Sequence, residues 1–154
     1  MRLTTMTDYS MRLLMYVGQN PGRLCTISEV AGVYGISEAH LMKITHKLGL
    51  AGWLETVRGK GGGIRLGANP ADINLGAVVR SIEPDFSLVA CLTTDSACML
   101  TGNCRLTSIV SDALQSFMAH LNRHTLADLL PASRDSTSRP RPMTFGKRPA
   151  RVPT

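Results

Sequence analysis

Residues 26–66 read TISEVAGVYGISEAHLMKITHKLGLAGWLETVRGKGGGIRL, and this stretch carries the strongest structural signal in the chain. Thr26, with Glu29 three residues later, has the spacing of a capping box at the start of a helix. Gly35 stands where a helix ends in a left-handed residue, and Ser37 is a candidate N-cap for the next helix. Two short capped helices separated by a glycine turn predict a helix-turn-helix.

The residues that follow Ser37 predict a recognition helix and a wing. We expect four apolar side chains of this helix to face inward: Leu41, Ile44, Leu48 and Leu50. Two alternating runs, residues 53–58 and 64–66, flank a glycine-rich basic centre, which is typical of a β-hairpin with a longer loop. The expected fold is therefore mainly α, with a small β-hairpin wing attached to the helix-turn-helix.

A winged helix-turn-helix can hold double-stranded DNA, because the recognition helix enters the major groove and the wing reaches the backbone or the minor groove. The candidate contacts are Ser37, His40, Lys43 and Lys47 on the helix and Arg58, Lys60 and Arg65 on the wing. Glycines at 61–63 would let backbone amides approach phosphates. The alternative is a protein-interaction module in which the lysines are ordinary solvated residues.

The distribution of charge favours DNA. Residues 1–65 carry eight Lys/Arg and four Asp/Glu, a net charge of +4, whereas residues 66–131 carry three and six, a net charge of −3. Residues 132–154 carry six and one, a net charge of +5, in a Ser-, Arg- and Pro-rich tail. A basic first half indicates a surface that meets a polyanion, while the basic tail can be a solvated appendage.

The whole chain divides into four expected parts. They are a DNA-binding winged helix-turn-helix at 1–70, a connecting helix and cysteine loop at 71–104, a dimerisation helix with a short terminal helix at 105–130, and a disordered basic tail at 131–154. Apolar residues recur along 105–123 with helical spacing. Such a stripe fits two helices packed across the two-fold axis of a homodimer, or packing within one chain.

Several function classes find no support. No apolar run is long enough to span a bilayer, and the N-terminus is a poor signal peptide, so we expect a cytoplasmic protein without a membrane partner. Aromatic residues make up 5% of the chain, too few for a base-stacking platform. No general base is paired with a nucleophile, so an enzyme is not supported.

Three of the four cysteines are clustered as Cys91-x6-Cys98-x5-Cys104. Disulfides are rare in a reducing cytoplasm, and thiolates suit zinc or iron–sulfur clusters. The spacing is wider than zinc knuckles usually show, and a loop of this width can wrap a bulky cluster. Inert or merely redox-active cysteines remain the alternative. We expect Cys25, which lies apart, to be a packed small residue.

Several segments together resemble the Rrf2 family of bacterial transcriptional regulators, and among them its nitric-oxide-sensing repressors. The matching segments are MRLTTMTDYSMRLL, ISEVAGVYGIS, VRGKGGGIRLG, AVVRSIEPDFSLVAC, the three cysteines and TLADLL, which cover residues 1–130. The resemblance implies a homodimer with an iron–sulfur cluster in each subunit. It implies Cys91, Cys98 and Cys104 as cluster ligands.

The resemblance also implies a fourth ligand, Asp8 from the partner subunit, which would give a [4Fe-4S] cluster. Arg12, one turn further, would be cluster-adjacent and could pair with Asp8. Thr107 stands where members of the [2Fe-2S] subtype carry a ligand His, which favours [4Fe-4S] over [2Fe-2S]. Met42 stands where that subtype has a base-reading Glu, so its DNA preference is not carried over.

The implied mechanism is a repressor that releases DNA when nitric oxide nitrosylates its cluster, so that detoxification genes are transcribed. The alternative within the family is a regulator that senses iron, redox state or iron–sulfur supply.

Overall fold

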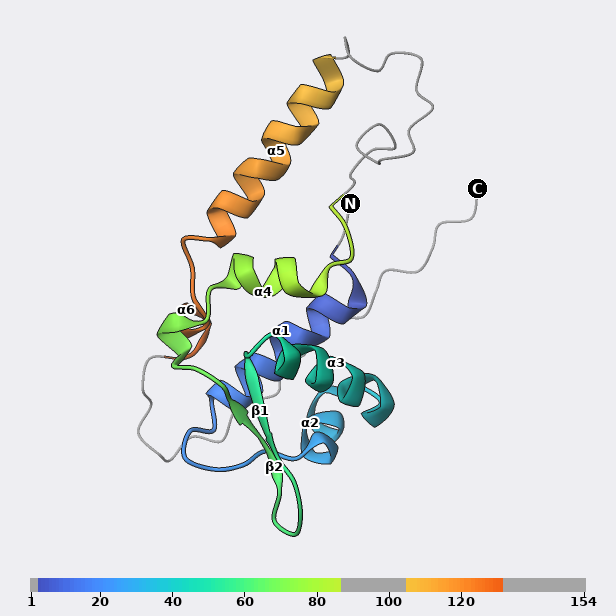
Figure 1. The fold of residues 1–154 in the computed structure, drawn as a ribbon, viewed down its shortest axis with the longest axis vertical. Coiled ribbons are helices and arrows are strands. Elements are labelled where there is room, and N and C mark those ends of the chain that lie inside the picture. The colour runs from blue at the N-terminus through green and yellow to red at the C-terminus, as the bar shows by residue number, and fades with distance from the viewer. Residues whose placement is uncertain (1–2, 87–104, 132–154) are drawn as a thin grey trace.

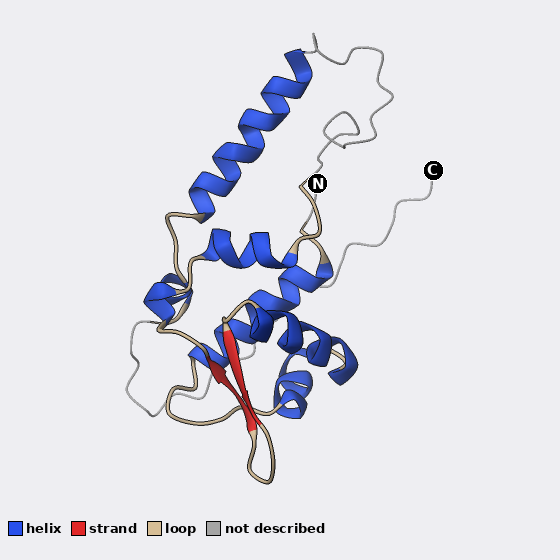
Figure 2. Ribbon diagram, in the orientation of Figure 1, coloured by secondary structure: helices blue, strands red, loops and turns tan. Residues whose placement is uncertain are grey.

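The structure is a computed structural model that describes residues 3–86 and 105–131 (Figure 1). The three clustered cysteines and the basic tail beyond Pro131 lie outside the described residues. The elements are α1 (Thr5–Gly18), α2 (Ile27–Tyr34), α3 (Glu38–Leu50), β1 (Leu54–Val57), β2 (Gly63–Leu66), η1 (Pro70–Asp72), α4 (Leu75–Ile82), α5 (Arg105–Leu121) and α6 (Leu126–Leu129). The expected mainly α fold with a hairpin wing is confirmed (Figure 2).

The helix boundaries follow the capping signals in the sequence. Thr26 and Ser37 each accept a hydrogen bond from a backbone N–H in the first turn of their helices, as an N-cap does. Gly35 ends α2 with a φ of 64°, a left-handed conformation that costs glycine little. Asn74 caps α4 through the N–H of Ala77. The segment before α4 is a short 3₁₀ helix rather than part of α4.

The wing is an antiparallel hairpin that the rest of the domain holds at its base. β1 pairs with β2, with Leu54 opposite Leu66. Cys25 adds an isolated bridge beside β2, because its N–H donates to the Ile64 carbonyl at 2.9 Å and its carbonyl accepts from the Ile64 N–H at 2.8 Å. Cys25 is a free, buried cysteine, as predicted, and its backbone ties the wing to the α1–α2 connection.

The hydrophobic core lies along one face of α1. Leu13, Leu14 and Val17 of α1 are buried. The rest of the described chain supplies the other core side chains: Cys25, Val30, Ile36, Leu41, Ile44, Leu48, Leu54, Ile64, Ile73, Val78, Ile82 and Leu126. The core therefore joins the helix-turn-helix, the hairpin, α4 and α6 into one packed body.

Leu50 corrects one sequence expectation. It was expected to face inward, but its exposed fraction is 78%. Leu41, Ile44 and Leu48 follow the 3.6-residue period of one helix face and are buried. Leu50, two residues beyond Leu48, is rotated by roughly 200° from it, onto the opposite face.

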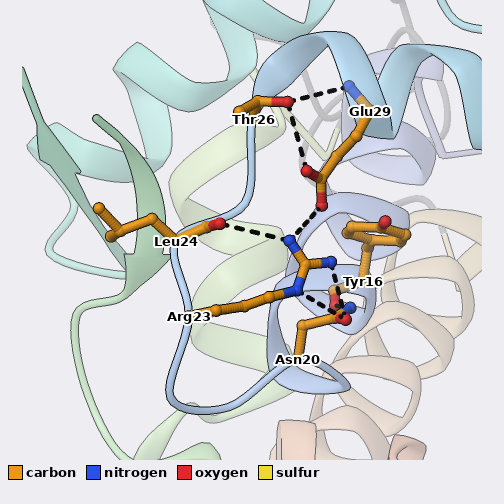
Figure 3. A network of polar contacts seen from close by, with 6 residues as sticks. All are labelled: Tyr16, Asn20, Arg23, Leu24, Thr26 and Glu29. Carbon is orange, nitrogen blue, oxygen red and sulfur yellow. Dashed lines mark hydrogen bonds and ion pairs between the residues drawn. The ribbon is translucent and has the colours of Figure 1, made fainter. Parts of the chain in front are cut away.

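A polar network fixes the connection between α1 and α2 (Figure 3). Arg23 pairs with Glu29 at 2.8 Å and donates to the Asn20 side chain at 2.9 Å. Burial opposes ionisation of Glu29, but hydrogen bonds from Arg23, Thr26 and Tyr16 outweigh it and lower the pKa of the carboxyl. Arg23 therefore serves the fold, although it contributes to the basic charge of the first half.

α5 extends away from the packed body, at the end opposite the hairpin (Figure 1). No residue of α5 is buried in the described chain, and Leu106 and Ile109 are 57% and 63% exposed. Within the described residues, the core therefore does not bury the stripe of α5. None of the described helices combines the length and apolar character that crossing a bilayer requires.

We predict that Gly63→Ala destabilises the protein by about 1–3 kcal/mol in urea unfolding. A Cβ at Gly63 would lie 2.6 Å from the Cys25 carbonyl oxygen, so the bridge between Cys25 and β2 would have to open. Gly32→Ala, in α2 with nothing within 4 Å of the new Cβ, is the control. It is expected to be neutral or stabilising by about 0.5–1 kcal/mol, because alanine favours helix. Equal stability of the two variants would contradict this account of the hairpin base.

Candidate nucleic-acid interface

The outer face of α3 is exposed along its full length. The buried residues Leu41, Ile44, Thr45 and Leu48 share one side of the helix. At about 100° per residue, Lys43 and His46 project from the opposite side, and both are exposed. Such a face, fixed from behind by the core, is the part of a helix-turn-helix that can enter a major groove.

Ser37 and His40 lie at the N-terminal end of α3. The Ser37 hydroxyl accepts from the His40 backbone N–H and lies 2.9 Å from His40 Nδ1. The His40 ring centroid is 6.5 Å from that of Tyr9 on α1. These contacts orient the imidazole, so a nucleic acid at this end of α3 would meet a His40 with restricted rotamers. Ser37 has a capping role that does not depend on DNA.

The cations of the first half divide into paired and unpaired groups. Arg12 pairs with Asp8, Arg23 with Glu29 and Arg65 with Glu55. Within the described part of the chain, the side chains of four others make no ion pair or hydrogen bond: Lys43, Lys47, Arg58 and Lys60. These four belong to α3 and the hairpin loop. The unpaired positive charge is thus concentrated on the two elements expected to meet DNA.

The hairpin loop presents two of these cations beyond the strands. Arg58 and Lys60 are exposed and lie between β1 and β2. Gly61 between them and β2 has a φ of 77°, which favours glycine. Arg65 differs, because its guanidinium lies 2.7 Å from Glu55 on the facing strand position. A DNA contact by Arg65 stays a prediction and would have to compete with this pair.

Two exposed residues of α3 were absent from the sequence-based set. Met42 is 55% exposed and His46 is also on the outer side. An apolar side chain there can contact the methyl group of thymine, and an imidazole can donate or accept at a base edge. Neither residue is a lysine or arginine, so a criterion of positive charge does not identify them. The phase of the helix relative to Leu41, Ile44 and Leu48 could have identified them.

The structure describes only one of the four candidate metal ligands. Asp8 lies on α1, and its carboxylate is 51% exposed and 2.9 Å from the Arg12 guanidinium. The predicted pairing of Asp8 with Arg12 is confirmed. Cys91, Cys98 and Cys104 lie outside the described residues, and no group of His, Cys, Asp and Glu side chains within those residues could hold a metal ion. By chemistry, three thiols and one accessible carboxylate match the donors of an iron–sulfur cluster.

Comparison with known proteins gives a consistent assignment. A family described as Rrf2, iron-dependent transcriptional regulator, matches residues 3–132. The HTH-type transcriptional regulator NsrR of Bacillus subtilis (strain 168) is 44% identical over 137 residues, which covers 88% of this chain and 94% of that protein.

Solved structures agree on the fold. CymR, the global cysteine regulator of B. subtilis, has a TM-score of 0.68 at 21% identity, covering 84% of this chain and 95% of its own. IscR of T. potens has a TM-score of 0.66 at 24% identity, covering 84% and 85%. The chain thus resembles winged-helix regulators over most of its length.

We predict different effects for the two unpaired cations of the hairpin loop. Arg58→Ala should weaken operator binding by about 1–3 kcal/mol if Arg58 reads a base. Lys60→Ala should lower the salt slope of binding by about one, because each phosphate contact releases about one counterion. Fluorescence anisotropy across a salt series measures both. Arg123→Ala, two residues after the end of α5, is the control. Equal affinity and equal salt slope in all three variants and the wild type would refute the docking surface.

Proposed function

The chain belongs to the Rrf2 family of transcriptional regulators, and from that premise we propose that it is a repressor whose iron–sulfur cluster senses nitric oxide. As a member of this family it is a DNA-binding transcriptional regulator and not an enzyme. The repression, the cluster and the signal are the proposed part.

The observation that carries the proposal is the similarity to NsrR of B. subtilis, 44% identity over 137 residues, which covers 88% of this chain. The unpaired cations on α3 and the hairpin loop support DNA as the partner. A positive surface of this kind raises the association rate with DNA and supplies the salt-dependent part of the affinity.

Four side chains would hold the cluster. Cys91, Cys98 and Cys104 would each supply a thiolate, and Asp8 of the partner subunit a carboxylate, as a [4Fe-4S] cluster requires. When bound, the cluster supplies iron that binds nitric oxide. Carboxylate is a hard ligand among soft ones, so Asp8 would be the most weakly held of the four.

Dimerisation is supported by α5. No side chain of this helix is buried, and the N-terminal part of its apolar stripe is open to solvent, with Leu106 and Ile109 more than half exposed. Burial of such side chains against a second copy would remove apolar surface from water. Each Å² of apolar surface buried stabilises the dimer by about 25 cal/mol. A homodimer would place two recognition helices for two half-sites of an operator.

The position of Asp8 supports its proposed influence on DNA binding. Asp8 belongs to the same helix as Leu13 and Leu14, which are buried in the core that also holds α3. Because protein cores transmit displacement, a ligand bond at Asp8 would restrain the position of α3. Loss of that bond would release the restraint and weaken operator binding.

A second sensing role uses the same residues. A family model described as iron-dependent also fits a sensor of iron or of iron–sulfur supply. The two differ in the signal, so anaerobic exposure to nitric oxide at constant iron separates them.

We predict that Cys91→Ala, Cys98→Ala and Cys104→Ala each lose cluster iron, whereas Cys25→Ala keeps it. Cys25 is buried and bonded to Ile64 through its backbone, and burial raises the pKa of its thiol, which disfavours the thiolate a metal needs. Iron and sulfide counts on anaerobically purified protein measure this. Full iron occupancy in Cys98→Ala would refute the ligand set.

A mixed dimer tests whether Asp8 acts across subunits. Asp8→Ala and Cys98→Ala chains carry different affinity tags, and two purification steps isolate the dimer that contains one of each. If Asp8 serves the partner's cysteines, one site of this dimer has all four ligands and reacts with nitric oxide at the wild-type rate. If Asp8 serves its own chain, both sites lack one ligand and no wild-type kinetic phase occurs.

Asp8→Ala homodimers should fold and dimerise normally, because Asp8 is half exposed and such positions change stability little. We predict weaker operator affinity or altered nitrosylation kinetics. Wild-type behaviour in both would show that Asp8 is not a ligand.

A further inference from the structure

The last turn of α4 contacts three other parts of the molecule through three nearby residues. Arg80 donates to the side chain of Asn122, the residue after α5, at 2.7 Å. Glu83 accepts from the Thr4 backbone N–H at 2.7 Å, at the start of α1. Ser81 accepts from the indole Nε1 of Trp53 at 3.1 Å. The chain then leaves this turn toward the segment that carries the three clustered cysteines.

Trp53 occupies the base of the wing. Its backbone N–H donates to the Leu48 carbonyl in α3 at 2.9 Å, and its carbonyl accepts from Gly67, just after β2, at 3.0 Å. β1 begins at the next residue, Leu54. Trp53 is half-buried and packs against the core. It therefore contacts the C-terminal part of the recognition helix and both strands at the base of the hairpin.

The contact between Trp53 and Ser81 has a defined direction. An indole N–H can only donate, so Ser81 Oγ must accept. The Ser81 hydroxyl in turn donates to the Val78 carbonyl at 2.7 Å, which orients its lone pairs. The chain of two hydrogen bonds runs from the wing base into the α4 backbone, so a shift of the last turn of α4 would lengthen the Trp53 bond directly.

We propose that Ser81 and Trp53 are positioning residues that couple the cysteine segment to the wing, through the hydrogen bond from Trp53 Nε1 to Ser81 Oγ. This inference rests on the proposed cluster-dependent function. Arg80 and Glu83 join the same turn to α5 and α1, and Ser81 joins it to the hairpin. Removal of the Ser81 bond should leave DNA binding possible but make it less dependent on the cluster.

The test compares operator affinity of full-length protein with the cluster intact and after its removal, by anisotropy under anaerobic conditions. The ratio of the two affinities should fall about two- to tenfold in Ser81→Ala and in Trp53→Phe, the range that one hydrogen bond supplies. Ser81→Thr keeps a hydroxyl and should restore the ratio. Ser116→Ala is the control, because Ser116 makes the same type of bond to its own helix, at 2.8 Å to the Asp112 carbonyl, on α5.

Two further measurements do not require DNA. Trp53 is the single tryptophan of the chain, so the emission maximum reports its indole, and it should shift on cluster removal in wild type but not in Ser81→Ala. Trypsin cleavage at Arg58 and Lys60 should also respond to the cluster in wild type and less so in Ser81→Ala. The thermal unfolding temperature of Ser81→Ala should differ little from that of the wild type.

The outcomes separate this inference from the function on which it rests. If wild-type operator affinity does not depend on the cluster, the proposed function is wrong. If it does, and both Ser81→Ala and Trp53→Phe retain the full wild-type affinity ratio and cleavage response while Ser81→Ala also retains the emission response, the coupling through Ser81 is wrong while the function stands.

Discussion

The buried face of α1 packs against the helix-turn-helix with its wing and also against α4 and α6. Leu13, Leu14 and Val17 contact a core to which α3 and β2 contribute on one side and α4 and α6 on the other. Because a close-packed core yields little to local strain, a displacement of α1 has to move its neighbours or be resisted by them. Asp8 lies on the exposed side of this same helix, so a bond formed at Asp8 would act on the recognition helix through packing alone.

The cations of the first half differ in whether a carboxylate pairs with them. Arginines with contacts inside the domain, such as Arg23 with Glu29, are paired with a carboxylate, while Lys43 and Arg58 face solvent on the elements that would meet DNA. Exposed pairs contribute little to stability, but a bound arginine is less available to a phosphate. The effective positive surface is thus smaller and more localised than the net charge of +4 over residues 1–65 implies.

Local signals in the sequence predicted most of the fold. Contacts between segments far apart in the chain could not be predicted in this way. Thr26, Gly35 and Ser37 act on their own neighbours, so their caps could be predicted from spacing. Leu50 was placed wrongly because its apolar character outweighed its helical phase. The Ser81–Trp53 and Thr4–Glu83 bonds join residues far apart in the chain, and no periodicity encodes them. The role of Asp8 came from resemblance, since an exposed carboxylate beside an arginine is common on helices.

The most direct measurement is an anaerobic titration of the cluster-loaded protein with nitric oxide, in which cluster absorbance and operator anisotropy are followed on one sample. The account predicts that DNA is released in proportion to the cluster that has reacted, at constant iron and in the absence of oxygen. Full operator binding after the cluster absorbance has been lost would contradict it.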